Sequence, residues 1–117
     1  MIKTGTLGNR AEKLAADYLS KRTLTLIKKN HHCRVGEIDL IMRDRDYLVF
    51  VEVRYRRSDT FGGALESVDY RKQNKLRKAA EHYLIQTKQQ DSPARFDVLC
   101  VNGSLNKPHF HWIKNAF

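Results

Sequence analysis

The sequence predicts an α/β domain in which a mixed β-sheet is flanked by helices. Three observations lead to this fold class: two segments carry apolar residues at helical spacing, the segment between them is rich in β-branched and aromatic residues, and a further strand-like segment follows the second helix. The 117-residue length and the 41% share of apolar residues suit a single domain over residues 1–117. A chain of this size buries roughly two-thirds of its unfolded surface, so it needs no disulfide or metal to fold.

Two segments have the apolar periodicity of amphipathic helices. The first runs from Arg10 to Arg22, and its apolar stripe consists of Ala11, Leu14, Ala15, Tyr18 and Leu19. The second runs from about Tyr70 to Gln89, and its stripe consists of Leu76, Ala79, Ala80, Tyr83 and Leu84. We expect Asp69 or Ser67 to cap the start of the second helix, because both side chains accept hydrogen bonds from the free amides of a first helical turn.

The remaining periodic segments are expected to form strands, at residues 23–33, 38–42, 47–53, 96–101 and 109–113. The polar residues 43–46 suit a hairpin connection between the second and third strands. The third strand is apolar on both faces, which predicts a central, buried position in the sheet. The element order is therefore α-β-β-β-α-β(-β), and the strand after the long helix can pair in parallel with an earlier one.

The composition limits the class of protein and its partners. The chain has 22 Lys and Arg against 13 Asp and Glu, a formal charge of +9, which indicates a polyanionic partner such as nucleic acid. The longest apolar stretch, residues 48–51, is far shorter than the ~20 residues of a membrane span. The amino terminus lacks the apolar core of a secretory signal, and Cys33 and Cys100 have no paired spacing. We therefore expect a cytoplasmic protein with no membrane partner and no disulfide framework.

Acidic side chains interrupt two apolar strands of the predicted hairpin. Glu52 extends a core-facing row, where a carboxylate is costly unless positive charge compensates it, and Arg54 follows on the same face. In the neighbouring strand Glu37 and Asp39 share a face. If the turn sets a suitable register, Asp39 and Glu52 lie together and favour a hard cation such as Mg²⁺ or Mn²⁺. The same pattern also fits a structural Glu52–Arg54 ion pair, with Asp39 as a solvated edge residue.

Basic residues surround these acids in the sequence. Arg56 and Arg57 follow the acidic strand with Tyr55 interleaved, so this segment is a candidate for binding a phosphate backbone. A second basic segment lies early in the long helix, where Arg71 and Lys75 are further candidates for nucleic-acid binding.

Other polar residues of the two helices receive different predictions. Lys72 and Gln73 extend the inward stripe of the long helix into its first turn, so either can reach the sheet. We assign Arg77 and Lys78 to an ordinary solvated helix face. Glu12 lies at the margin of the first apolar stripe, and the pattern alone favours its exposure to solvent.

The predicted hairpin resembles the signature of the YraN-like family of small bacterial proteins. The residues that carry the resemblance are the segments GEIDLI from Gly36 and LVFVEVRYR from Leu48. The resemblance continues through Phe61-Gly62-Gly63, Lys72-Gln73, Lys75-Leu76, Arg95-Phe96-Asp97-Val98 and the closing residues 112–117, WIKNAF. It covers nearly the whole chain from Glu12 onward, and the ordered series makes it specific.

The resemblance implies a fold and a set of site residues. The family is grouped with the restriction-endonuclease-like PD-(D/E)xK superfamily and is similar to archaeal Holliday junction resolvases. It implies a metal-binding set of Glu12 from the first helix, Asp39, and Glu52 as the acid of the E-x-K element. Lys72 or Gln73 would then supply an auxiliary polar group, and Glu37 is a further auxiliary candidate.

Arg54 departs from the superfamily pattern, because it stands where the superfamily has a lysine. Arginine does not lose its proton near neutral pH, so Arg54 cannot be a general base. It can still donate two hydrogen bonds to a phosphate group. Catalysis by Asp39, Glu52 and Arg54 would then depend on the metal to lower the pKa of water. The superfamily proline is also absent, since Ile38 precedes Asp39.

Three functional hypotheses follow from the sequence. The first is a Mg²⁺-dependent endonuclease that hydrolyses DNA phosphodiesters, with branched or other non-standard structures as candidate substrates. The second is a nucleic-acid-binding module that keeps the nuclease fold without efficient catalysis. The third is a protein-interaction or regulatory domain whose charge only keeps it soluble. Similar resolvases work as dimers, which makes a homodimer one option for this chain.

Overall fold

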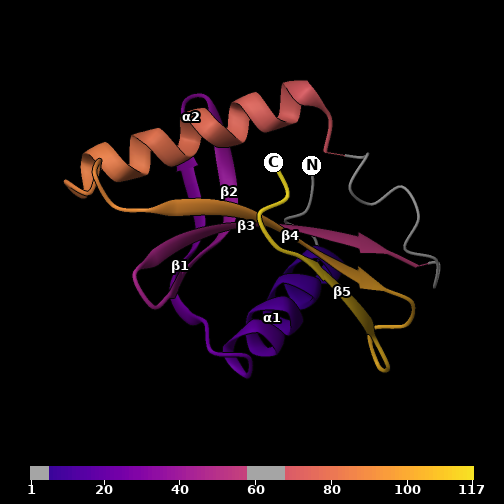
Figure 1. Ribbon diagram of the computed structural model, residues 1–117. Helices are drawn as coiled ribbons and strands as arrows, with labels where there is room; N and C mark the ends of the chain where they lie inside the picture. Colours follow the sequence, from indigo (N-terminus) through magenta and orange to yellow (C-terminus); the bar gives the residue numbers. More distant parts are fainter. Residues whose placement is uncertain (1–5, 58–67) are drawn as a thin grey trace.

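The structure, a computed structural model, describes residues 6–57 and 68–117. Its elements follow the predicted order (Figure 1) and are α1 (Thr6–Ser20), β1 (Thr25–Cys33), β2 (Gly36–Asp44), β3 (Tyr47–Arg56), α2 (Tyr70–Gln86), β4 (Ala94–Asn102) and β5 (His109–Ile113). The α/β class is confirmed. Ser67 and the segment Phe61-Gly62-Gly63, both selected from the sequence, lie outside the described residues. Within the described part of the chain, no helix is long and apolar enough to cross a membrane.

The five strands form one mixed sheet in the order β1-β2-β3-β4-β5. The pairs β1–β2, β2–β3 and β4–β5 are antiparallel, whereas β3 and β4 are parallel. The strand that follows α2 therefore pairs in parallel with an earlier strand, as predicted. The central place of β3 is also confirmed, because two strands lie on each side of it.

The two helices cover opposite faces of the sheet, with α2 on one side and α1 on the other (Figure 1). Successive residues of β3 divide between the two cores. The core on the α1 side includes Ala11, Ala15, Leu19, Val49, Val51 and Val53. The core on the α2 side includes Leu48, Phe50, Leu76, Ala79 and Tyr83. Because each helix needs its own apolar face of the sheet, β3 is buried on both sides.

The ends of α2 are set by side chains and backbone conformation. Asp69 caps the helix, and its carboxylate accepts a hydrogen bond from the Lys72 backbone amide at 2.8 Å. The helix ends earlier than the sequence predicted, because the Thr87 hydroxyl donates to the Tyr83 carbonyl at 2.8 Å and Lys88 adopts a φ of 57°. A left-handed residue of this kind stops a right-handed helix.

The strands of the β2–β3 hairpin are longer than predicted. Only Arg45 and Asp46 remain in the turn, in place of the predicted connection at residues 43–46, and Arg45 adopts the positive φ of 59° that short hairpin turns require. At its other end β3 continues to Arg56. Arg54 and Arg56 therefore belong to the strand itself.

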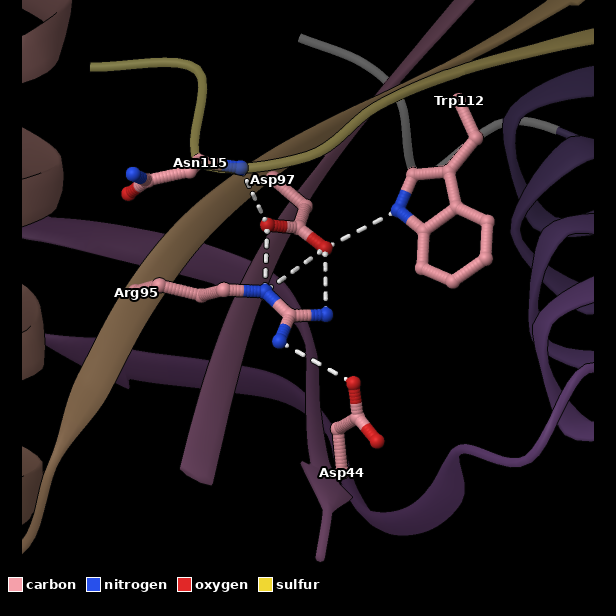
Figure 2. Close-up of polar contacts among 5 residues, drawn as sticks. All are labelled: Asp44, Arg95, Asp97, Trp112 and Asn115. Atoms are coloured by element: carbon pink, nitrogen blue, oxygen red, sulfur yellow. Dashed lines mark hydrogen bonds and ion pairs between the residues drawn. The ribbon is translucent and has the colours of Figure 1, made fainter. Parts of the chain in front are cut away.

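A buried polar network joins the carboxyl-terminal strands to the end of β2 (Figure 2). Asp97 is fully buried and accepts hydrogen bonds from Arg95 Nε at 3.0 Å, from the Trp112 indole at 2.9 Å and from the Asn115 backbone amide at 2.9 Å. Arg95 also donates to Asp44 at 3.0 Å. Burial opposes the charge of Arg95, but the bonds and charges of Asp97 and then Asp44 raise its pKa overall. The network therefore connects β2, β4, β5 and the residues that follow β5.

Candidate functional site

The strands β2 and β3 separate beside the predicted acids. Their pairing ends at Leu40 and Val51, whereas β3 stays paired with β4 as far as Arg56. Beyond the last pair, Asp39 Oδ2 accepts a hydrogen bond from the Val53 backbone amide at 2.9 Å. The Asp39 side chain thus takes the place of a backbone partner. Asp39 is 1% exposed, so its interpretation as a solvated edge residue is wrong.

The backbone around Asp39 is irregular. Ile38 and Ile41 both pack in the core on the α2 side, although strict alternation would place them on opposite faces. On β1, Asn30 has a φ of 52°, a left-handed conformation that asparagine adopts more readily than most residues. These departures from regular strand geometry accompany the turn of the Asp39 carboxylate toward β3.

Glu52 is a buried carboxylate that two cationic side chains contact. It is 2% exposed, and its Oε2 lies 3.2 Å from Arg54 Nε and 3.8 Å from Lys72 Nζ. Asp39 and Glu52 are the next residues beyond the last β2–β3 pair, so the register brings their positions side by side. The ion pair between Glu52 and Arg54 that the sequence suggested is present. Lys72, an inward residue of α2, adds a second cation to it.

The other candidate auxiliary residues have different contacts. Gln73 Nε2 donates to the Val68 carbonyl at 3.0 Å, which fixes the chain just before α2. Glu37 Oε1 lies 4.0 Å from His32 Nδ1 across the β1–β2 hairpin. Of these three residues, Lys72 is therefore the one seen in contact with Glu52.

Glu12 is buried, and the expectation that solvent surrounds it is wrong. It is 4% exposed on α1. The neighbouring small residues Ala11, Ala15 and Ala16 are also buried, so the helix backbone lies close to the sheet and the covered stripe is wider than the periodicity indicated. Because α1 and α2 cover opposite faces, Glu12 approaches the sheet from the side opposite Lys72.

The donor set fits a small hard cation with few protein ligands. Across residues 6–57 and 68–117, no three His, Cys, Asp or Glu side chains gather as they would to enclose a metal ion. Mg²⁺ does not need such a cage, because it is commonly held by one or two carboxylates while water and substrate phosphates complete its coordination. Asp39 and Glu52 supply two carboxylates of this kind, and a carboxylate that accepts one hydrogen bond keeps further lone pairs.

A basic groove lies between the β1–β2 turn and the first half of α2. Its volume is about 670 Å³, and the residues that line it are Arg34, Val35, Tyr70, Arg71, Asn74, Lys75 and Lys78. This α2 groove includes Arg71 and Lys75, which the sequence selected for nucleic-acid binding. It also includes Arg34 and Lys78, which the sequence did not select, and Tyr70, which is 75% exposed.

The α2 groove depends on a contact that has no local sequence signal. A Cβ atom on Gly36 would lie 3.3 Å from the Lys75 carbonyl oxygen, so glycine allows the β1–β2 turn to approach the helix backbone closely. This approach brings Arg34 beside α2. Arg34 gives no sign of this role in the sequence, because its basic neighbours in the groove belong to α2, which is far from Arg34 along the chain.

Arg56, the last residue of β3, and Arg57, which follows it, have different surroundings. Arg56 is half-buried near Cys100. Burial raises the pKa of the Cys100 thiol, and the charges of Arg56 and Arg54 offset only part of this rise. Arg57 is exposed and lines a second pocket, which we name the α1 pocket, together with Arg10 and Tyr55. The volume of the α1 pocket is about 380 Å³.

A pair of histidines, buried His31 and exposed His82, joins β1 to α2. His31 is 1% exposed, and its Nε2 lies 3.2 Å from His82 Nδ1 while its Nδ1 lies 3.1 Å from Lys28 Nζ. The edge of the Tyr83 ring also packs against it, with the ring centroids 5.3 Å apart. Burial lowers the pKa of His31, and the charges of Lys28, His82 and His32 lower it further.

This pair makes stability dependent on pH. The unfolded chain binds more protons than the folded one between the folded pKa of His31 and its ordinary value of about 6.5. The stabilisation by neutral His31 is therefore complete above that value and is lost as the pH falls toward the folded pKa. We expect the melting temperature to drop by a few degrees between pH 7.5 and 5.5, and to drop less in His31→Phe. His109→Gln, a change at an exposed histidine, should retain the full drop. An equal drop in His31→Phe would contradict the assignment.

Comparisons with known proteins agree on one family. A family model described as uncharacterised protein family UPF0102 matches residues 11–101. A UPF0102 protein of Legionella pneumophila is 52% identical over 111 residues, which cover 94% of this chain and 92% of the relative. A UPF0102 protein of Nitrosomonas europaea is 48% identical over 117 residues, and one of Stutzerimonas stutzeri is 48% identical over 118 residues. Both alignments cover 100% of this chain and 98% of the relative.

Proposed function

The chain belongs to the uncharacterised UPF0102 family, which confirms the YraN-like resemblance, and for this member we propose metal-dependent hydrolysis of nucleic-acid phosphodiesters, with DNA as the expected substrate. One observation carries the proposal. Buried Glu52 contacts the cations Arg54 and Lys72 beside Asp39, at the point where β2 and β3 separate. Acids and cations this close together are typical of sites that bind a metal and a phosphate group.

Each side chain has a role that its chemistry allows. Asp39 and Glu52 would hold Mg²⁺ or Mn²⁺, which supplies charge stabilisation and lowers the pKa of water. Arg54 would donate to the phosphate oxygens, for which its planar guanidinium is suited. Arg54 stands at the position of the superfamily lysine and cannot give up a proton. Lys72 supplies a lysine in its place, because its Nζ lies 3.8 Å from the Glu52 oxygen that Arg54 also contacts. The amine of lysine, unlike a guanidinium, can exchange a proton during the reaction.

The α2 groove provides a path for the phosphate backbone. Lys72 faces Glu52, while Arg71 and Lys75 on the same helix line the groove. A nucleic acid in the groove would therefore run along the helix that carries Lys72. Arg34 adds a cation from the other wall of the groove. Phosphate neutralisation by such residues makes binding strongly dependent on salt.

We propose a restriction-endonuclease-like core for the same reasons. The chain places an acid from its first helix and two acids from a hairpin against a mixed sheet, with a polar residue supplied by the long helix. This is the arrangement that the resemblance to the PD-(D/E)xK superfamily implies, with Glu12, Asp39 and Glu52 as the acids.

A second function, nucleic-acid binding without cleavage, is favoured by the same ion pairs. Arg54 and Lys72 already compensate the charge of Glu52, so the fold does not require a metal at this position. In that case the protein would bind DNA in a salt-sensitive manner and would cleave no substrate. Creation of cleavage by Arg54→Lys would then identify the lost chemistry.

The proposed function is tested by incubating the protein with flap, junction, single-stranded and duplex DNA in Mg²⁺ or Mn²⁺, with EDTA as the metal-free control. We expect cleavage only with metal. Lys72→Met should lower the rate by about 100-fold, the loss typical for one preorganised electrostatic group. Lys13→Met is the control, because Lys13 is an exposed lysine on α1, outside the α2 groove, and it should keep the wild-type rate. Cleavage that survives in EDTA, or equal rates in the two variants, would contradict the proposal.

A further inference from the structure

The α1 pocket combines two guanidinium groups with an aromatic ring. Arg10 comes from α1, Tyr55 comes from the end of β3, and Arg57 directly follows that strand. In the part of the chain that the structure describes, neither Arg10 nor Arg57 has an acidic partner. Two guanidiniums at one pocket, with no acidic partner among the described residues, are suited to an anion from outside, and the planar guanidinium matches the geometry of a phosphate group.

The aromatic wall of the pocket is held in place before any ligand binds. Tyr55 is half-buried against the core on the α1 side, and its hydroxyl donates to the Gly103 carbonyl at 3.4 Å. Ser104 and Asn106 also line the pocket and supply polar groups, and Ser104 Oγ accepts a hydrogen bond from the Asn106 backbone amide at 3.2 Å. A fixed ring lowers the entropy lost on binding and gives a platform on which a nucleobase can stack.

The α1 pocket lies close to the candidate site along β3. Tyr55 follows Glu52 by three residues on β3, which places their Cα atoms roughly 10 Å apart along the strand. Alternation turns Tyr55 to the α1 side, whereas Lys72 meets Glu52 on the α2 side. A strand of nucleic acid that passes the end of β3 can therefore reach both the candidate site and the α1 pocket.

From these features we infer that the α1 pocket binds one unpaired nucleotide, with its base against Tyr55 and its phosphate between Arg10 and Arg57. The volume of about 380 Å³ lies in the range of small-ligand sites and suits a single nucleotide. A base inside a duplex cannot enter, because its faces are covered by stacking. The inference rests on the proposed function, in which nucleic acid is the substrate. It narrows the substrate class to nucleic acids that contain an unpaired nucleotide.

The test measures binding without metal, so it is independent of cleavage. Fluorescence anisotropy in EDTA compares a fully paired DNA duplex with the same duplex carrying one bulged thymidine. We expect wild-type protein to bind the bulged duplex about tenfold more tightly, the range that stacking of one base provides. Tyr55→Phe should retain this preference, and Tyr55→Ala should remove it. Arg57→Ala, at an exposed position that does not support the fold, should weaken binding of the bulged duplex more than binding of the paired one.

A second measurement locates the nucleotide. In ¹⁵N NMR spectra, thymidine 5′-monophosphate should shift the amides of Gly103, Ser104 and Asn106, and Lys78→Ala in the α2 groove should leave these shifts unchanged. Equal affinity for the two duplexes, shifts confined to the α2 groove, or equal binding of inorganic phosphate would each overturn the inference. None of these outcomes depends on whether the protein cleaves DNA.

Discussion

Replacing Asp97 with asparagine is expected to lower the free energy of unfolding by about 3–5 kcal/mol, because it removes one partner of a buried ion pair. The carboxylate accepts hydrogen bonds from Arg95, Trp112 and the Asn115 amide, and it is fully buried. The asparagine amide has the same shape but carries an NH₂ group that would face one of these donors. Arg95 would also lose one of the two negative charges that it contacts.

Urea and thermal unfolding measure this loss, and a shift of roughly 10–20 °C in the melting temperature corresponds to it. Trp112 is the only tryptophan of the chain, so its fluorescence reports directly on the network. Asp44→Asn is the matched control, since Asp44 makes one contact with Arg95 and its side chain is 20% exposed. It should cost about 1 kcal/mol. If both variants lost the same stability, Asp97 would not be the centre of the network.

The sequence predicted the main elements because their signals are local. The two helices, the succession of helices and strands along the chain, and the burial of β3 all follow from spacing within a short window. The parallel pairing of β4 was predictable because a long helix precedes it. The acids Asp39 and Glu52 were found because each stands where an apolar residue would cost less, and both are buried in the structure.

Asp97 was missed as a structural centre, although the same test could have found it. It lies on the strand face shared with Leu99 and Val101, so an acid there also interrupts an apolar row. Its partners Arg95, Trp112 and Asn115 come from segments whose geometry only the folded chain defines. A buried carboxylate at such a position can belong to a functional site or to a structural hydrogen-bond network. Only the contacts that it makes in the folded chain distinguish the two.

The burial of Glu12 and the α2 groove were less predictable because both depend on tertiary packing. The exposure of Glu12 depends on how closely the alanine-rich face of α1 approaches the sheet, which periodicity does not measure. The groove depends on the contact between Gly36 and the backbone at Lys75. Both features arise from distances between elements, whereas the sequence patterns describe positions within one element.

Asp39→Asn separates the structural role of Asp39 from the proposed catalytic one. In the wild type, the Val53 backbone amide donates to Asp39 Oδ2 at 2.9 Å. The asparagine oxygen can still accept this hydrogen bond, so we expect a melting temperature close to that of the wild type. The negative charge is removed, and with it one of the two carboxylates proposed to hold the metal. Cleavage should fall by at least about 10³-fold, because the metal and the groups it positions act together.

Glu52→Gln should give a similar loss of cleavage but at a cost in stability, since Arg54 and Lys72 would then lie beside a neutral side chain. Comparison of the two variants separates loss of activity from loss of fold. The double variant should be no slower than either single variant, because residues that act as one unit are not additive. Wild-type cleavage by folded Asp39→Asn would show that the charge of Asp39 serves no step of the reaction, and the carboxylate would then have only the role of bridging β2 to β3.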